Sequence, residues 1–527
     1  PGMHWAKLLG VLCLTAVARA ELLAYYTVAG PPSHPLSARV IFSNDTTECP
    51  HIYLDKEKHK MEVRATPSVE FPVLVCSQKM PGGVTSAEVV LEDDQGNSIP
   101  HIDLPVLHNS SARSGRMLFV GDTGCLLKGD DESRHQDCNN RTQWPWQDIA
   151  ERAALENPEV VVHVGDYVYR VQTCPVGDAG CENSSFGDVW ESWNEDFFTP
   201  AAVLLQNSVW IPSRGNHEAC NNMGPGFFRL LHWGDFEHDK WCMRYTAPYA
   251  VDMPHQQIIV MDTSEIVETE LGLEPSDELS HEQVDIYKFH FQQAKAWAKS
   301  QMPKRSFIVS HRPMWGLGHD HDNANFPVVA LDKTMQAAAQ NHLPENEFVG
   351  VIAGHIHFLQ HLHFNGGRQP QFVFGNSGSS LAPPVSHLKG RKVSNATVTK
   401  GTCVAEFGYS IIDPVGPNGP GKCHAECSKS VHRHPRWHVQ SKTINGTVIM
   451  TAHIEGAKLA TYDEEHPGAD DILEADVEVR LATDAHSDAA PAIVGATFVF
   501  VVVVAMAVHL SKSRHLCGSR TAHVRMV

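Results

Sequence analysis

Short apolar runs recur through the middle of this chain, and five of them end just before residues that commonly bind metals. The runs cover residues 117–120, 160–164, 209–212, 307–310 and 348–353. Short apolar runs of this kind, rich in β-branched residues, predict buried strands. Because ligands of open α/β sheets bind beyond the carboxyl ends of the strands, the residues that follow these runs are expected to meet at one site.

Segments with a helical spacing of apolar residues alternate with these strands. They cover residues 144–155, 188–205 and 281–301. This alternation predicts an α/β domain. Residues 448–454 are predicted to form a final strand, and the Pro- and Gly-rich residues 411–427 a loop.

The residues that follow the five strands form a series of metal-ligand types. The motifs are Gly121-Asp122-Thr123-Gly124, Gly165-Asp166-Tyr167-Val168-Tyr169, Gly215-Asn216-His217-Glu218, His311-Arg312-Pro313 and Gly354-His355-Ile356-His357. A single Asp after a strand is usually structural, but five such endings in one chain indicate a shared site. Carboxylates, an amide and imidazoles suit two adjacent cations that share a bridging ligand, and Asp166 is the expected bridge.

In this order the motifs resemble those of the calcineurin-like metallophosphoesterases, and in particular the purple acid phosphatases. The first motif of the superfamily is Asp-x-His, whereas this chain has Gly124 at the third position and Tyr169 three residues after Asp166. Purple acid phosphatases make the same exchange, with a tyrosinate that binds ferric iron. The resemblance covers roughly residues 116–380. It implies an α/β fold class, with a metallophosphoesterase αββα sandwich in a catalytic domain over residues 116–455.

The resemblance also implies a role for each motif residue. The ligands of Fe³⁺ would be Asp122, Tyr169 and His357, the ligands of a second ion (Zn²⁺, Mn²⁺ or Fe²⁺) would be Asn216, His311 and His355, and Asp166 would bridge the two. Tyr167 is the alternative to Tyr169, since a tyrosine after a strand can simply pack. His217 would bind the phosphate or protonate the leaving alkoxide, provided that Glu218 or another residue orients it.

Four more residues are candidates for binding the substrate phosphate. His319 and His321 follow His311 at distances where relatives carry phosphate-binding histidines. Arg170 and Arg214 flank the motifs, and a guanidinium group can clamp a phosphate. The alternatives are a solvated loop for the two histidines and surface ion pairs for the two arginines.

The expected function is hydrolysis of phosphomonoesters by attack of a metal-bound hydroxide, with a phosphorylated small molecule or protein as substrate. A phosphodiesterase acting on nucleotides or phospholipids could use the same two metals. A non-catalytic cell-surface receptor that keeps the fold is the alternative from another class. The complete ligand series together with His217 favours an enzyme.

The remaining segments predict a membrane-anchored protein of the secretory pathway. Residues 1–20 are predicted to be a signal peptide, because their apolar run is too short to span a bilayer and ends in a small-x-small site. Residues 21–115 predict a β-rich accessory domain. Residues 456–490 are predicted to form an acidic stalk, and residues 491–510 a single transmembrane helix. The basic residues 511–527 are predicted to form a cytoplasmic tail.

The net charge and the histidine content limit the binding partners and the compartment that we expect for this protein. The formal charge of −19 excludes a nucleic-acid-binding surface, which requires a basic footprint. The 33 histidines would ionise in an acidic lumen, so the catalytic domain is expected at the cell surface or in an acidic vesicle.

Of the thirteen cysteines, eleven lie in the presumed lumen, where disulfides persist. The pairs that the spacing suggests are Cys49/Cys76, Cys125/Cys138, Cys174/Cys181 and Cys423/Cys427. No two C-x-x-C motifs occur, which disfavours a zinc–thiolate site. Acceptor sequons for N-glycosylation lie at Asn44, Asn109, Asn140, Asn183, Asn395 and Asn445.

Overall fold

The computed structural model describes residues 21–455, apart from 45, 47, 92–100, 108–114, 128–134, 267–277, 302–303, 320–323, 326, 341–342, 344–346, 417–418 and 421–435. The predicted signal peptide, stalk, transmembrane helix and tail lie outside the described residues, as do His321, Asn109 and the pair Cys423/Cys427. Within the described ranges, no helix is both long and apolar enough to cross a bilayer.

A large mixed sheet carries the first three motifs at the ends of its central strands. Its strands in spatial order are β25 (Val448–Glu455), β24 (Arg436–Thr443), β22 (Gly408–Gly416), β9 (Met117–Val120), β10 (Val160–His163), β11 (Val209–Pro212), β1 (Leu22–Ala29), β2 (Leu36–Ser43), β6 (Val73–Met80) and β5 (Glu62–Ala65), and β23 (Gly419–Pro420) pairs with β22. Strands β9, β10 and β11 are parallel and in register, so the residues that follow them emerge at the same edge.

A second sheet carries the last two motifs. Its strands in spatial order are β12 (Tyr249–Asp252), β13 (Gln256–Met261), β14 (Arg305–Ser310), β17 (Phe348–Ala353), β19 (Gln371–Phe374), β18 (Leu359–Phe364), β21 (Ala396–Val404) and β20 (Lys392–Val393). Strands β14 and β17 are parallel neighbours, which brings the residues after them together. Two smaller sheets pair β15 (Leu317–His319) with β16 (Val328–Ala330), and order β4 (Glu57–Lys60), β3 (His51–Leu54), β7 (Ala87–Val90) and β8 (Ile102–Leu104).

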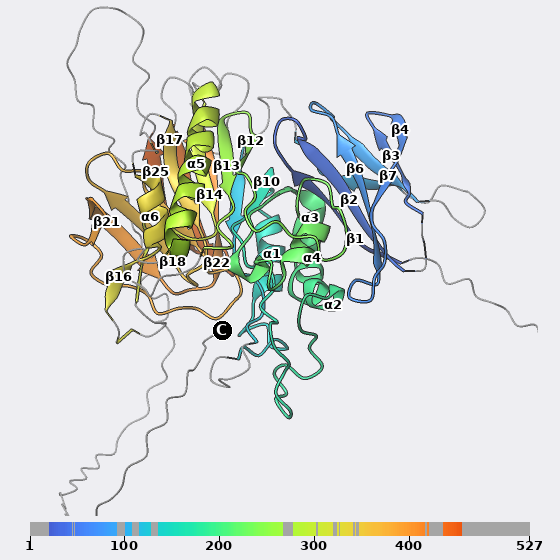
Figure 1. Cartoon of the computed structure of the whole chain (residues 1–527), viewed down its shortest axis with the longest axis horizontal. Helices are drawn as coiled ribbons and strands as arrows, with labels where there is room; N and C mark the ends of the chain where they lie inside the picture. The colour runs from blue at the N-terminus through green and yellow to red at the C-terminus, as the bar shows by residue number, and fades with distance from the viewer. Residues whose placement is uncertain are drawn as a thin grey trace, which may run out of the picture. The chain divides into compact units, whose positions relative to one another are not determined.

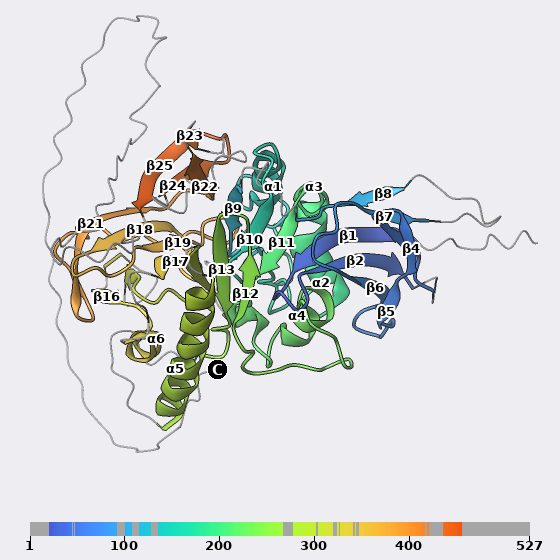
Figure 2. The same ribbon diagram turned by 90° about the horizontal axis from the view of Figure 1, so that it is seen from above.

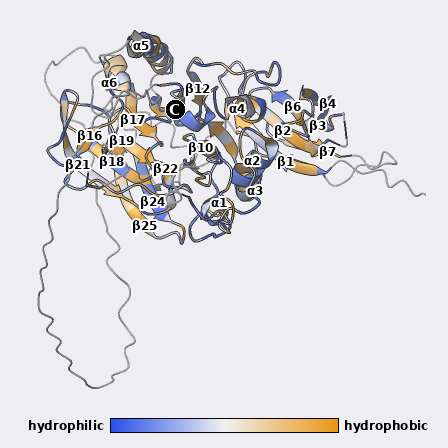
Figure 3. Cartoon of the chain, turned by 60° about the horizontal axis from the view of Figure 1, so that its bottom comes forward, coloured by the Kyte–Doolittle hydropathy of each residue, from blue (hydrophilic) through white to orange (hydrophobic). Residues whose placement is uncertain are grey.

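The two large sheets pack face to face, and helices cover their outer faces (Figures 1 and 2). The helices on the first sheet are α1 (Trp146–Ala154), α2 (Trp190–Trp193), α3 (Thr199–Asn207) and α4 (Gly224–Leu230), and those on the second are α5 (Glu278–Ser300) and α6 (Lys333–Ala339). Because both faces of each central strand are covered, these strands are apolar without alternation, and Figure 3 colours many of them hydrophobic. This helix–sheet–sheet–helix layering confirms the predicted α/β class.

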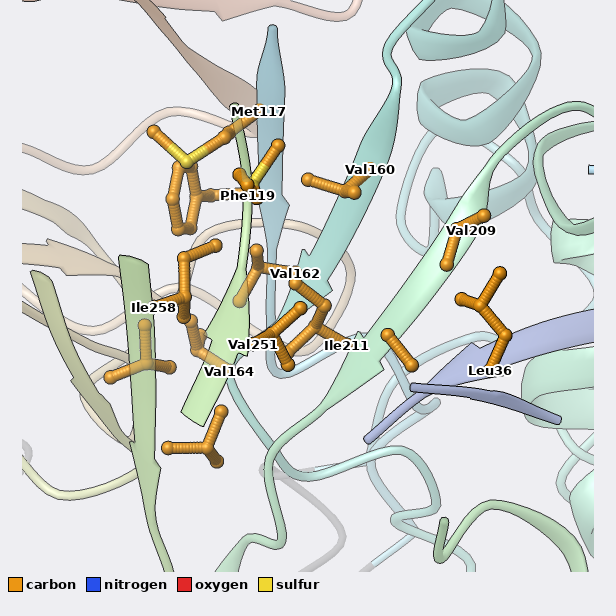
Figure 4. Packing of buried hydrophobic residues seen from close by; sticks show 14 of the residues in the cluster. Leu36, Met117, Phe119, Val160, Val162, Val164, Val209, Ile211, Val251 and Ile258 are labelled. Carbon is orange, nitrogen blue, oxygen red and sulfur yellow. The ribbon is translucent and has the colours of Figure 1, made fainter. Parts of the chain in front are cut away.

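Alternate residues of the central strands fill the space between the two sheets. Phe119 of β9 and Val162 of β10 belong to the same buried cluster as Ile258 of β13 (Figure 4). The intervening residues Leu118 and Val161 face the helix layer instead. This period of two holds the strand ends rigidly against both layers, and so fixes the loops that carry the motifs.

The N-terminal segment shares the first sheet with the first three motifs. Strand β1 pairs in parallel with β11, with Val28 opposite Trp210. Arg64 of β5 donates hydrogen bonds to the carbonyl oxygens of Phe228 and Gly234, at and beyond the end of α4. Strands β3, β4, β7 and β8 form a separate sheet within this segment.

The predicted elements agree with the structure in kind and differ in detail. The helices at 144–155 and 281–301 correspond to α1 and α5, and the strand at 448–454 to β25. The helix predicted over 188–205 is divided by a π-helical turn, Asn194–Phe198, between α2 and α3. The loop predicted over 411–427 is wrong for 411–416, which belong to β22. Pro414 is tolerated there because β9 pairs no further along β22 than Ile412.

Four disulfides join cysteines of the described residues: Cys49–Cys76, Cys125–Cys138, Cys174–Cys181 and Cys220–Cys242. The first three confirm pairs suggested by spacing. The fourth was not foreseen, and it closes the segment that follows His217. Sequon residues Asn44, Asn183, Asn395 and Asn445 are exposed.

Candidate metal centre

The motif residues from both sheets meet in one buried cluster. Asp122 follows β9, Asp166 and Tyr169 follow β10, Asn216 and His217 follow β11, His311 directly follows β14, and His355 and His357 follow β17. The convergence results from the parallel register of these strands within each sheet and from the packing of the two sheets.

One half of the cluster surrounds the phenol oxygen of Tyr169. This oxygen lies 2.9 Å from Oδ1 of Asp122, 2.7 Å from Oδ2 of Asp166 and 2.8 Å from Nε2 of His357. The same Nε2 is 3.5 Å from Oδ1 of Asp122. Two carboxylates, a phenol and an imidazole therefore direct their donor atoms at one small volume.

The other half surrounds Nε2 of His311. This nitrogen lies 2.9 Å from Oδ1 of Asn216, 3.2 Å from Oδ2 of Asp166 and 3.2 Å from Nδ1 of His355. The ligand atoms of Asp166, His311 and His355 all lie within 4.8 Å of one another. Asp166 thus belongs to both halves, as a bridging carboxylate must.

Three of these residues hold a left-handed backbone. The φ angles are 54° at Asp122, 59° at Asp166 and 73° at His355. This region is uncommon for residues other than glycine, and strained residues of this kind cluster at functional sites. Backbone N–H groups face both carboxylates: His355 N donates to Oδ2 of Asp122, and His217 N donates to Oδ1 of Asp166.

Glu218 holds the loop of Asp166 in place. Its buried carboxylate accepts hydrogen bonds from the backbone N–H groups of Asp166, Tyr167 and Gly215 at 2.8–3.0 Å. Burial and the charge of Asp166 raise the pKa of Glu218 to about 8. The structure therefore gives Glu218 a role in positioning Asp166, where the sequence had suggested a role in orienting His217.

The carboxyl and imidazole groups of the cluster have pKa values that are shifted in opposite directions. Burial raises the pKa of Asp122 to about 6. Burial also acts on Asp166, but the charges of His311 and His217 outweigh it and hold the pKa of that carboxyl well below its usual range. Burial opposes protonation of His311, yet the charge and hydrogen bond of Asp166 raise its pKa to about 9. Such pairs of opposed shifts are typical of functional sites.

The choice between the two tyrosines is clear in the structure. Tyr167 stacks on His163 at 3.8 Å between ring centroids and donates to the carbonyl oxygen of Ser213, so it packs inside the helix layer. Tyr169 alone points into the cluster. A Cβ atom on Gly124 would lie 2.6 Å from the backbone nitrogen of Tyr169, so no side chain fits there without moving Tyr169.

The two candidate arginines are engaged in buried ion pairs. The Nε of Arg170 lies 2.6 Å from Asp196, and its Nη1 lies 2.6 Å from Glu195. Arg214 pairs with Asp262 at 3.0 Å and donates to two backbone carbonyl oxygens. These contacts favour positioning of the motif loops over direct binding of phosphate. His319 ends β15, and His321 lies outside the described residues.

The sequence did not single out two residues that contact the cluster. Nη1 of Arg312 lies 3.0 Å from Nε2 of His355. Asp196 accepts a hydrogen bond from the backbone N–H of Tyr169 at 3.0 Å. The position of Arg312 directly after His311 was an available signal, whereas Asp196 lies in the π-helical turn and no motif marks it.

The donor set fits a pair of metal ions. Hard carboxylate and phenol oxygens gather around Tyr169, and imidazole and amide donors gather around His311, which matches the preferences of a hard and a borderline cation. A second group with ligand-like spacing, His135, Asp178 and Cys181, is a poorer candidate because Cys181 is bonded to Cys174.

Comparison with known proteins agrees with this arrangement. Residues 115–359 match the family model of the calcineurin-like phosphoesterases, a family that uses a binuclear metal centre. No curated protein matches the chain. Among solved structures it is similar to GAP50, described as the anchor in the inner membrane complex of Plasmodium. The identity is 12% over 65% of this chain and 89% of that one, with a TM-score of 0.34.

Proposed function

We propose that this chain is a metal-dependent phosphatase of the purple acid phosphatase type, which hydrolyses phosphomonoesters. The observation that carries the proposal is the position of Tyr169 between Asp122 and Asp166, with Gly124 leaving no space for a histidine. The same exchange of a histidine for a tyrosine distinguishes the purple acid phosphatases within the wider superfamily.

The ligand assignment follows from the two halves of the cluster. Asp122, Tyr169 and His357 would hold one ion, Asn216, His311 and His355 would hold the other, and Asp166 would bridge them. A pair of ions held by these residues would polarise the phosphoryl group as Lewis acids and would lower the pKa of a water nucleophile.

Tyr169 favours Fe³⁺ as one of the two ions. Burial and the neighbouring charges of Asp122 and Asp166 raise the pKa of its phenol well above the usual value, so the phenol keeps its proton unless a cation compensates. A hard trivalent ion does so best. The imidazoles and the amide of the other half suit Zn²⁺, Mn²⁺ or Fe²⁺.

His217 would act on the substrate. Its backbone is fixed by the hydrogen bond to Asp166, and its ring lies 3.9 Å from the ring of Tyr169. The side chain is only half-buried, so it lies between the buried ligands and the outside. From there the imidazole binds the phosphate of a bound ester or donates a proton to the leaving alkoxide.

We place the enzyme in the secretory pathway. Four disulfides are typical of proteins that fold in an oxidising compartment. The predicted signal peptide and transmembrane helix, both outside the described residues, would leave the catalytic domain in the lumen or at the cell surface. The substrate would be a phosphorylated small molecule or protein.

The test compares a phosphomonoester with a diester. The full chain, loaded with iron and zinc, is assayed between pH 4 and 8 on para-nitrophenyl phosphate and on bis-para-nitrophenyl phosphate, with Asp166→Asn as the inactive control. We expect a higher kcat/KM for the monoester. A higher value for the diester would make the chain a phosphodiesterase. No hydrolysis of either ester by protein that retains both metals would favour the non-catalytic alternative.

A further inference from the structure

Strand β18 carries a pair of histidines that the catalytic centre does not use. His361 and His363 are two residues apart, so both point to the same side of the sheet. On that side, Leu359 and Phe372 belong to the buried cluster between the two large sheets. Strand β18 lies between β19 and β21 (Figure 2).

The two imidazole rings are in contact and differ in their surroundings. Their centroids are 4.7 Å apart, with an angle of 79° between the ring planes. His361 also stacks on Phe372 at 4.4 Å and 7°. His361 is 1% exposed, whereas His363 is half-buried.

Both rings have a buried nitrogen with no hydrogen-bond partner in the part of the chain that the structure describes. These atoms are Nε2 of His361 and Nε2 of His363. Buried polar atoms are normally paired, because a lost hydrogen bond to water is costly. Packing on Phe372 accounts for a flat ring at position 361, but a phenylalanine would pack equally well. The two nitrogens therefore need a further explanation.

The spacing of the pair fits a chelate. Histidines two apart on one strand face offer two nitrogen donors to one ion. With Zn–N bonds of about 2.0–2.1 Å, the two donors must be about 3–4 Å apart. Rings whose centroids are 4.7 Å apart allow such a separation. In the pairing register Thr402 of β21 lies opposite His361, so its hydroxyl or a water could complete the coordination.

We propose that His361 and His363 bind a first-row transition cation of the Zn²⁺ or Cu²⁺ type, at a site separate from the catalytic pair. Neutral imidazole is a preferred ligand of both ions, and Cu²⁺ binds such sites more tightly than Zn²⁺. The inference does not depend on the proposed phosphatase activity.

The charge state of the pair supports this role in an acidic compartment. Burial holds the pKa of His361 well below its usual range, and burial together with Lys400 lowers the pKa of His363 to about 4. Both rings thus remain neutral, which metal binding requires, at pH values where exposed histidines are charged. Lys400 is opposite His363 in the register and opposes a cation, although its exposed side chain can extend into water.

The experiment counts metal in the full chain. Protein stripped with a chelator is reloaded with excess Zn²⁺ and desalted, and zinc per chain is measured by mass spectrometry. The test variant is the double substitution His361→Phe, His363→Gln, which keeps the ring stack on Phe372. The matched control is His438→Gln, His453→Gln, a histidine pair on two neighbouring strands with ring centroids 4.9 Å apart.

We expect the test variant to bind one zinc fewer per chain than the wild type, and the control to bind the same number. As a test that does not depend on the folding of the double variant, His363→Gln alone is compared at matched circular dichroism, and we expect at least tenfold weaker binding of the extra zinc. Lys400→Ala should tighten it. Equal affinity of the wild type and His363→Gln for the extra zinc, or loss of the extra zinc from the His438/His453 control instead, overturns the proposal.

Discussion

The phenol oxygen of Tyr169 lies 2.7 Å from Oδ2 of Asp166, only three residues earlier in the same loop. This contact is possible because the loop begins at Gly165, with φ at +106°, where a Cβ atom would lie 2.6 Å from Nδ1 of His311. A residue with a side chain at 165 would separate the loop from His311. The tight turn therefore joins the two halves of the cluster at Asp166.

Replacement of Tyr169 by phenylalanine should remove one ligand and leave the fold intact. Tyrosinate bound to ferric iron absorbs visible light, so we expect the violet or pink colour of the oxidised, iron-loaded wild type to be lost. Activity should fall at least about tenfold, because even outer-shell partners of metals contribute that much. The measurement is a visible spectrum with the iron content per chain.

Tyr167→Phe is the matched control for this prediction. It removes one hydroxyl that donates to the carbonyl oxygen of Ser213, and it should keep both colour and activity. If Tyr167→Phe bleached the protein and Tyr169→Phe did not, the assignment of the phenol ligand would be wrong.

Gly124→Ala should destabilise the protein and weaken its metal binding. The new Cβ atom would lie 2.6 Å from the backbone nitrogen of Tyr169 and 2.8 Å from Asp196. Overpacking of this kind costs about 1–3 kcal/mol, which should appear as a lower melting temperature. Gly82→Ala is the control, since its Cβ atom would meet only Pro35 at 3.8 Å. Equal melting temperatures for the two variants would contradict the close packing at Gly124.

The sequence was sufficient to predict that the motif residues meet, because the signal for each of them is local. Each ligand lies within a few residues of the end of an apolar strand, and parallel strands bring such ends to one edge. The choice of Tyr169 over Tyr167 could not be made from spacing alone. It depends on the π-helical turn at Asn194–Phe198, whose Asp196 binds the backbone N–H of Tyr169.

Glu218→Gln should reduce metal affinity without removing a metal ligand. The carboxylate accepts three backbone N–H groups, and an amide would turn its own N–H₂ group toward at least one of them. The loop of Asp166 should then loosen, and the affinity should fall about 10–100-fold. Metal dissociation constants measured by competition with a chelator test this prediction.

The control for Glu218→Gln is Glu195→Gln, which changes a half-exposed partner of Arg170. It should change metal affinity by less than a factor of three. An equal loss of affinity in both variants would indicate a general loosening instead of a specific role for Glu218.

The carboxyl group of Asp188 should stabilise the folded protein more at acidic pH than at neutral pH. Burial raises the pKa of this carboxyl to about 6, so the folded state binds the proton more tightly than the unfolded state. Its contribution is complete below the ordinary value of 3.8 and is lost as the pH rises through about 6. The melting temperature of the wild type minus that of Asp188→Asn should therefore be larger at pH 4.5 than at pH 7.5.

The control for Asp188→Asn is Asp285→Asn, which changes an exposed carboxyl. Its difference from the wild type should be small at both pH values. A difference for Asp188→Asn that grows toward pH 7.5 would have the wrong sign and would refute the prediction.

Long-range pairing explains what the sequence did not reveal. Nothing in β1 indicates that it pairs with β11, some 180 residues later, because strand pairing depends on tertiary packing. The disulfide Cys220–Cys242 could not be predicted either, since the spacing of cysteines in the sequence does not determine which of them pair. The residues that neighbour Arg170 and Arg214 in the sequence do not indicate that these arginines pair with the buried carboxylates of Asp196 and Asp262.

The central claim is that two ions share the carboxylate of Asp166, and anomalous diffraction from crystals of the metal-loaded chain tests it most directly. The account predicts two peaks about 3.5–4 Å apart, both within bonding distance of Asp166, one beside Tyr169 and the other beside His311. A single peak, or two peaks of which one does not contact Asp166, would contradict it.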